Sequence, residues 1–145
     1  METTRNTLFV DNPLPSVHRR VTTRRSPYLN CFYAHFPVRV CLDTGAESSL
    51  VSERFAKYVD LHIEPATQGA VQEDVKTPLD VIGEVKDVQI NRGPYIFKFN
   101  ALVTKTNFGD VIAGEPFLED NDIAVRPFKK QIIIKGQDVV PHNYA

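Results

Sequence analysis

The sequence predicts an all-β domain whose strands close into a barrel, with one or two short helices. Three observations support this fold class. Apolar and β-branched residues fall into runs of strand length, and turn-forming residues separate these runs at regular spacing. The length of 145 residues, with 42% hydrophobic and 24% charged residues, suits one globular domain with a single core.

The charge is nearly balanced overall, but its distribution is uneven. The formal net charge of −1 gives no field that would favour nucleic acid or a membrane surface, and no apolar stretch approaches the roughly 20 residues of a membrane span. Residues 1–27 contain five arginines and three prolines against two acidic residues, which predicts a flexible spacer. A basic arm that contacts RNA is the alternative for this segment. We therefore divide the chain into a spacer (1–27), a domain (28–140) and a tail (141–145).

The first part of the domain reads as a hairpin followed by a helix. Residues 29–33 and 38–42 are rich in β-forming side chains. Alternation in the second strand places Val38, Val40 and Leu42 on one face and Arg39, Cys41 and Asp43 on the other. Residues 52–58 form the best helical candidate, and Ser52 suits its N-cap.

The rest of the domain reads as further strands. Residues 65–78 are polar and contain Gly69, as expected for a long hairpin tip or a mobile loop. A bent strand over 79–90, a turn at 91–94 and a strand over 95–103 follow. The remaining expected elements are a short apolar run at 110–114, a turn or single helical turn at 115–121, and strands at 122–126 and 130–135.

Most catalytic classes lack their motifs in this sequence. It contains no Gly-x-Ser-x-Gly elbow, no Walker loop and no Gly-x-Gly-x-x-Gly. The four histidines have no ligand spacing, and neither cysteine has a nearby histidine that would activate a thiol nucleophile. We therefore expect neither a metal nor an organic cofactor.

The run Asp43-Thr44-Gly45-Ala46 is the remaining candidate site. An apolar strand leads directly into the acid, where a buried and uncompensated carboxylate would be costly. For the tripeptide alone, an ordinary turn in which the aspartate accepts backbone N–H bonds is the favoured interpretation.

Two segments together resemble the retropepsin family, the aspartic proteases of retroviruses and Gypsy-like retrotransposons. The first is Leu42-Asp43-Thr44-Gly45-Ala46-Glu47-Ser48-Ser49, and the second is Val111-Ile112-Ala113-Gly114-Glu115-Pro116-Phe117-Leu118. They lie roughly 70 residues apart, in the family's order, and residues 70–83 between them resemble its flap hairpin. The resemblance covers residues 28–135.

The resemblance implies an acid-protease barrel that works as a homodimer on extended polypeptide. Because the chain has one Asp-Thr-Gly, the second carboxylate would come from another copy, with the active site at a twofold interface. Asp43 would be catalytic, and Thr44, Gly45 and Gly114 would support it. The residues that would contact substrate are Gly45, Ala46, Glu47, Ala70, Val71, Gln72, Glu73, Asp74 and Ile112.

The resemblance also suggests a substrate and a location, and two alternative functions remain open. The substrate would be a Gag-Pol-like polyprotein, and the location intracellular, in cytoplasm or a virus-like particle. An inactive, domesticated domain that serves for binding or dimerisation is the first alternative, and a cellular protease of the same fold is the second. Val75 at the flap tip and Pro116 in the second segment depart from the family pattern.

Cys31 and Cys41 raise a separate question. A three-residue turn at 35–37 would set them opposite each other across the hairpin, so a disulfide is conceivable. Two reduced cysteines are the simpler expectation, because nothing else in the sequence indicates an oxidising compartment.

Overall fold

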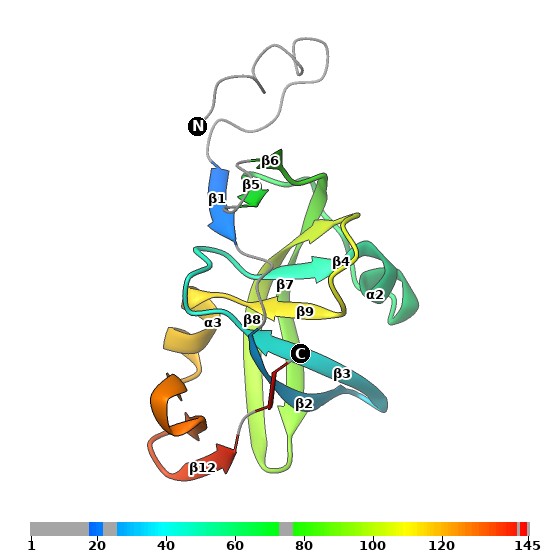
Figure 1. Cartoon of the computed structure of the whole chain (residues 1–145). Coiled ribbons are helices and arrows are strands. Elements are labelled where there is room, and N and C mark those ends of the chain that lie inside the picture. Colours follow the sequence, from blue (N-terminus) through cyan, green and yellow to red (C-terminus); the bar gives the residue numbers. More distant parts are fainter. Residues whose placement is uncertain (1–17, 22–25, 73–76, 142, 145) are drawn as a thin grey trace.

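The computed structural model describes residues 18–21, 26–72, 77–141 and 143–144, and shows mostly β-strands (Figure 1). The strands are β1 (His18–Val21), β2 (Pro27–Tyr33), β3 (Phe36–Leu42), β4 (Leu50–Ser52), β5 (Gly69–Gln72), β6 (Thr77–Pro78), β7 (Val81–Arg92), β8 (Tyr95–Thr104), β9 (Val111–Ala113), β10 (Ile123–Arg126), β11 (Gln131–Ile134), β12 (Asp138–Pro141) and β13 (Asn143–Tyr144). The helices are α2 (Glu53–Tyr58), α3 (Glu115–Asp120) and the 3₁₀ turn η1 (Pro127–Lys129).

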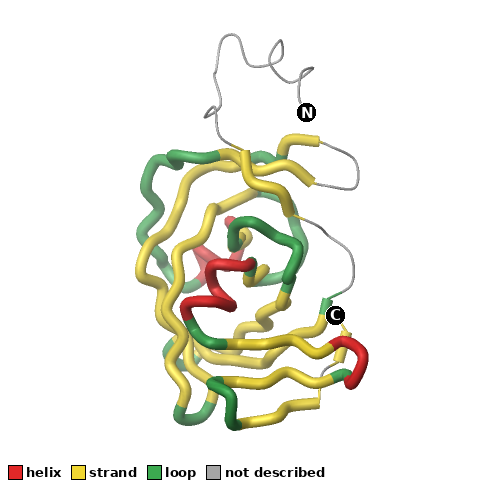
Figure 2. The backbone as a smooth tube through the Cα atoms, turned by 90° about the vertical axis from the view of Figure 1, so that its left-hand side faces the viewer, coloured by secondary structure: helices red, strands yellow, loops and turns green. Residues whose placement is uncertain are grey.

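Six strands close into a barrel, in the order β2-β3-β9-β4-β8-β7. The seam between β7 and β2 is narrow, with Phe32 opposite Asn91. Close to it, the Arg92 guanidinium donates a hydrogen bond to the Asn30 carbonyl at 2.9 Å. In the tube view the strands run round the molecule as a ring (Figure 2). This confirms the all-β closed barrel with two short helices that the sequence predicts.

The barrel interior and α3 share one apolar core. Phe97 and Phe117 are buried, and the ring of Phe117 lies 5.9 Å from that of Phe97 and 5.0 Å from that of Phe99. The predicted inward face of β3 is confirmed, because Val38, Val40 and Leu42 are all buried. Tilted ring pairs at these distances add to the stabilisation from burial. Helix α3 is thereby fixed against β8.

The two short helices begin where local chemistry predicts. Ser52 caps α2, because its Oγ accepts the Phe55 amide at 3.1 Å. Gly114 stands at the N-cap of α3, and Pro116 lies in the first turn, where no backbone N–H is needed. The predicted helices at 52–58 and 115–121 are therefore confirmed within a residue or two.

The long hairpin β7–β8 bends as the imperfect alternation predicts. Its register shifts between Val81 and Gly83 and again between Val85 and Val88, as at β-bulges. Gly83 lets the segment at Ile63 and Glu64 lie close against β7, since a Cβ there would overlap Ile63 Cγ2 and would lie 2.6 Å from the Glu64 carbonyl oxygen. The turn that joins the strands has Gly93 at a φ of 55°, a conformation that glycine adopts without strain.

Two smaller sheets flank the barrel. One has the order β10-β11-β12. The other has the order β1-β5-β6, with β5 and β6 antiparallel and β1 parallel to β5. Strand β1 lies inside the segment predicted as a spacer, and β13, in the predicted tail, pairs with β2. The domain boundaries themselves stay a prediction. Among the described residues, no helix has the length and hydropathy to cross a membrane.

The register of the first hairpin corrects the prediction for the cysteines. The turn contains Ala34 and His35 alone, because Tyr33 pairs with Phe36 and Ala34 adopts a φ of 54°. Cys31 therefore lies opposite Val38, and Cys41 lies opposite Tyr28. The two cysteines are not cross-strand partners, and both are free thiols.

Candidate active site

Asp43 follows the last residue of β3 and is only 5% exposed. Its position depends on the parallel pairing of β3 with β9, in which Leu42 lies opposite Ala113. The Asp43 amide continues this ladder by donating to the Ala113 carbonyl at 2.8 Å. The predicted acid and the second predicted segment are therefore adjacent, although they are far apart in the sequence.

A tight turn orients the carboxylate. Asp43 Oδ1 accepts the Gly45 amide at 3.0 Å, and the Ala46 amide donates to the Asp43 carbonyl at 3.2 Å. The first contact is the aspartate turn that the tripeptide alone would explain. Thr44 and Gly45 are exposed at the tip of this turn. The turn thus exposes Thr44 and Gly45 at the surface, while the Asp43 side chain stays buried.

The segment at the start of α3 holds the Asp43 loop in place by hydrogen bonds. The Gly114 amide donates to Ser49 Oγ at 2.9 Å, and the Glu115 amide donates to the Ala46 carbonyl at 2.8 Å. Gly114 packs so closely that a Cβ there would lie 2.5 Å from the Ser48 carbonyl oxygen. Pro116 offers no polar side chain, so backbone amides and Ser49 supply the bracing contacts.

Three of the residues predicted to contact substrate meet in a small apolar cluster. Ala46 of the loop, Ala70 of β5 and Ile112 of β9 are buried in the same cluster, together with Leu50, Leu79 and Leu102. This cluster joins the loop that carries Asp43 to the base of the hairpin β5–β6, at the position of the predicted flap. Val71 and Gln72 lie in β5. Glu73, Asp74 and Val75 lie outside the described residues.

Glu47 is half-buried and lines a cavity of about 270 Å³ beside the loop. Ser48, Thr67, Glu84, Asn100 and Pro116 also line it. The cavity therefore lies between the Asp43 loop, the residues that lead into β5, and the hairpin β7–β8.

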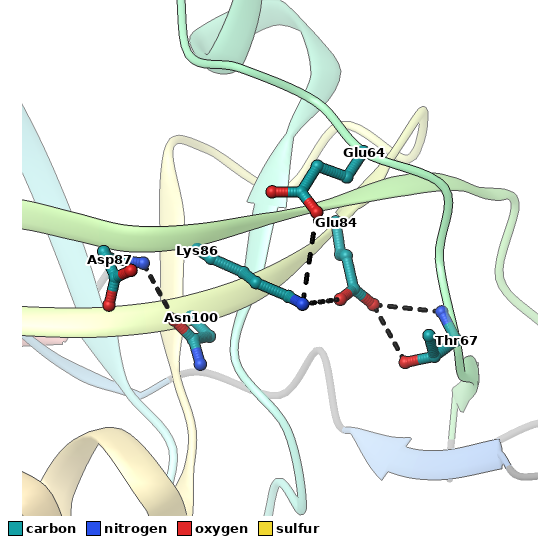
Figure 3. A network of polar contacts seen from close by, with 6 residues as sticks. All are labelled: Glu64, Thr67, Glu84, Lys86, Asp87 and Asn100. Carbon is teal, nitrogen blue, oxygen red and sulfur yellow. Dashed lines mark hydrogen bonds and ion pairs between the residues drawn. The ribbon is translucent and has the colours of Figure 1, made fainter.

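A polar network borders this cavity and was not predicted from the sequence (Figure 3). Glu84 Oε1 accepts the Thr67 amide at 3.0 Å and the Thr67 hydroxyl at 3.1 Å, and Glu84 Oε2 lies 3.6 Å from Lys86 Nζ. These contacts, the Thr67 amide foremost, lower the pKa of Glu84. The network ties the segment before β5 to the barrel. Its residues are ordinary surface types in the sequence, so no pattern could reveal it.

The described residues contain no cluster of three or more histidine, cysteine or acidic side chains that could hold a metal ion. Burial raises the pKa of Cys31 to about 11 and raises that of Cys41, so neither thiol is activated as a nucleophile. Of the acidic side chains described, Asp43 and Glu84 are buried, and Asp43 is the one that lies in the predicted motif.

Comparisons by sequence find no relative: no protein-family model matches the chain, and no curated protein matches it. Solved structures do match. The retroviral protease-like domain of Ddi1 from Leishmania major has 17% identity and a TM-score of 0.61, over 81% of this chain and 91% of that domain. The EIAV protease, complexed with an inhibitor, has 21% identity and a TM-score of 0.54, over 67% of this chain and 88% of that protease. The chain therefore has the retropepsin fold.

Proposed function

We propose that this chain, which has the retropepsin fold, is an aspartic endopeptidase that acts as a twofold homodimer. Asp43 of each protomer supplies one carboxylate of the active site. The substrate is an extended polypeptide, and we propose a Gag-Pol-like polyprotein processed inside the cell, in cytoplasm or in a virus-like particle. No metal or organic cofactor takes part in the proposed reaction.

One observation carries the proposal. Asp43 is buried at the end of β3, and its loop is bound to the segment Ala113–Glu115 by three separate hydrogen bonds. A plain surface turn does not require such bracing. A carboxylate that must keep its position within a few tenths of an ångström does require it.

The single Asp-Thr-Gly explains why a dimer is needed. Two carboxylates about 3 Å apart cannot both ionise, so they share one proton. The ionised carboxylate takes a proton from water, and the resulting hydroxide adds to the scissile carbonyl carbon. The protonated carboxylate donates to the carbonyl oxygen. The first carboxylate then gives the proton that it took from water to the amide nitrogen, a hydroxyl of the tetrahedral intermediate gives its proton to the second carboxylate, and the C–N bond breaks.

The neighbouring residues take roles by their position. We propose that Thr44, which is exposed and follows Asp43 in the sequence, meets the partner protomer across the twofold axis. Gly45 and Glu47 offer backbone groups to the substrate, and β5 adds backbone hydrogen bonds to it as in strand addition. Gly114 is a positioning residue, because it touches the loop and not the reacting atoms.

The test is cleavage of a peptide library at mildly acidic pH by the wild-type chain and by Asp43→Asn, both at high protein concentration. We expect cleavage by the wild type and a loss of at least about a thousandfold in the variant. Thermal unfolding of both proteins is the control that tests whether the variant is folded. Equal activity in the two proteins, or none in either, would refute the proposal.

A further inference from the structure

The edge of β5 already holds a strand of this same chain. β5 is the middle strand of its sheet: β6 pairs with one edge and β1 pairs in parallel with the other, with His18 opposite Gly69 and Val21 opposite Gln72. Residues 22–68 separate the two strands in the sequence. The pairing is therefore a long-range contact and not a consequence of chain connectivity.

The position of β1 bears on how a substrate would reach Asp43. In Figure 1, β1 lies beside the hairpin β5–β6, and its end points toward the cyan loop between β3 and β4, which carries Asp43. An extended peptide that pairs with β5 and reaches Asp43 must run through this same space. Ala46, Ala70 and Ile112, which the family resemblance assigns to substrate contact, are buried in one apolar cluster that joins β5 to the Asp43 loop.

Short length makes the contact reversible. β1 has four residues, and closing the long connection between β1 and β5 costs conformational entropy. The segment is nevertheless tethered to its site, so its effective concentration is on the order of millimolar. A tethered strand of this kind can compete with a free peptide without binding tightly.

We propose that His18–Val21 is an intramolecular occupant of the substrate cleft. It pairs with the edge of β5 opposite β6, in place of a substrate peptide. This inference rests on the proposed function for the meaning of the site. Release of β1 opens the β5 edge, so an external polypeptide gains access only in the molecules from which β1 has dissociated. Residues Arg19 and Arg20 lie opposite Ala70 and Val71 in this pairing.

Two adjacent proline substitutions test the pairing in the full chain. In a parallel ladder, alternate residues of an edge strand direct their N–H at the neighbour, so of Arg19 and Arg20 one bonds β5 and the other does not. Arg19→Pro and Arg20→Pro are therefore each other's matched control. We expect one of them to raise amide hydrogen exchange in β5 by about tenfold or more, while exchange in β8 stays unchanged.

Competition is measured separately, without catalysis. In the Asp43→Asn background, a synthetic peptide of residues 16–23 is titrated against the chain with and without the effective proline substitution. If β1 is docked in about nine of ten molecules, the substituted chain binds the peptide about tenfold more tightly. In the active chain, the same substitution lowers the KM of a cleaved library peptide to a similar extent and leaves kcat unchanged.

The outcomes separate this inference from the proposed function. Unchanged exchange in β5 for both proline variants, or unchanged peptide affinity, overturns the inference whether or not the chain cleaves peptides. Faster exchange with about tenfold tighter peptide binding supports it. If these two changes occur and no chain cleaves any peptide, the proposed function fails while the occupancy of the β5 edge by β1 stands.

Discussion

The backbone amide of Gly114 donates a buried hydrogen bond of 2.9 Å to the hydroxyl of Ser49. This contact joins the segment that begins α3 to the loop that leads from Asp43 into β4. It holds together the two halves of the candidate site.

Ser49→Ala should destabilise the fold by about 1–3 kcal/mol, because the Gly114 amide is left buried without a partner. The measurement is the free energy of unfolding in urea. Ser48→Ala is the matched control: the Ser48 hydroxyl is half-buried and makes only a long contact of 3.4 Å to the Ser49 carbonyl. An equal loss in the two variants would contradict the role of the Ser49 hydrogen bond.

Gly114→Ala should cost about 2–4 kcal/mol, because the new methyl group would overlap the Ser48 and Ala46 carbonyl oxygens. Gly45→Ala in the same loop is the control for stability. Its Cβ would meet only Asp43 Oδ1, at an ordinary 3.6 Å, so its unfolding midpoint should stay within a few degrees of wild type. A stable Gly114→Ala protein would show that the loop can move away from α3.

Asp43→Asn chains should inhibit the wild-type chain by forming mixed dimers with it. With random pairing, an equal amount of the variant reduces the activity of a fixed amount of wild type to about half, because half of the wild-type chains are then paired with an inactive partner. Bovine albumin at the same mass concentration is the control for nonspecific effects. Undiminished activity would indicate that each chain carries a complete site.

Glu84 should titrate below the usual range of a glutamate, because Thr67 donates two hydrogen bonds to its carboxylate. A pKa lowered in the folded state stabilises the fold above the unfolded pKa, and this stabilisation is lost as the pH falls through the folded pKa. Thr67→Val removes the hydroxyl and keeps the amide, so it should raise the pKa of Glu84 part of the way. Titration of the Glu84 side-chain carboxyl by NMR measures the shift, and an unchanged pKa would contradict it.

Cys31 should resist thiol reagents in the folded chain, because burial raises its pKa to about 11 and leaves almost no thiolate at pH 8. Cys41 is partly accessible and its pKa is raised as well, so we expect it to react slowly and before Cys31. Labelling in Cys31→Ala and Cys41→Ala measures the two rates, with the urea-unfolded chain as the reference. A disulfide between them in the folded protein would contradict the hairpin register.

The sequence predicts the barrel and its main strands because each strand has a local signal. The alternation over β3, the capping serine of α2 and the glycine turn before β8 all act within a few residues. The register of the hairpin β2–β3 was predicted wrongly at the turn. The two-residue turn there has a positive φ at Ala34, and alanine is not a residue type from which a positive φ is expected.

Local sequence patterns could not predict the strand pairings between distant segments. Nothing in His18–Val21 or Asn143–Tyr144 marks either segment as a partner of β5 or β2, because each has only a few residues and its pairing is decided by what the rest of the fold leaves open. The Thr67–Glu84–Lys86 network is similar, since Thr67 lies 17 residues before Glu84 and only the fold brings the two together. The motif around Asp43 was visible because its chemistry is contiguous in sequence.

The parallel pairing of β3 with β9 also has a consequence for how the chain folds. The Ala113 carbonyl accepts the Asp43 amide, and the Glu115 and Gly114 amides bond Ala46 and Ser49 of the same loop, far away in the sequence. Contacts of such separation form late and slowly, after the intervening hairpin β7–β8 is in place. A nascent chain whose residue 115 has not yet left the ribosome therefore cannot hold the Asp43 carboxylate in this position.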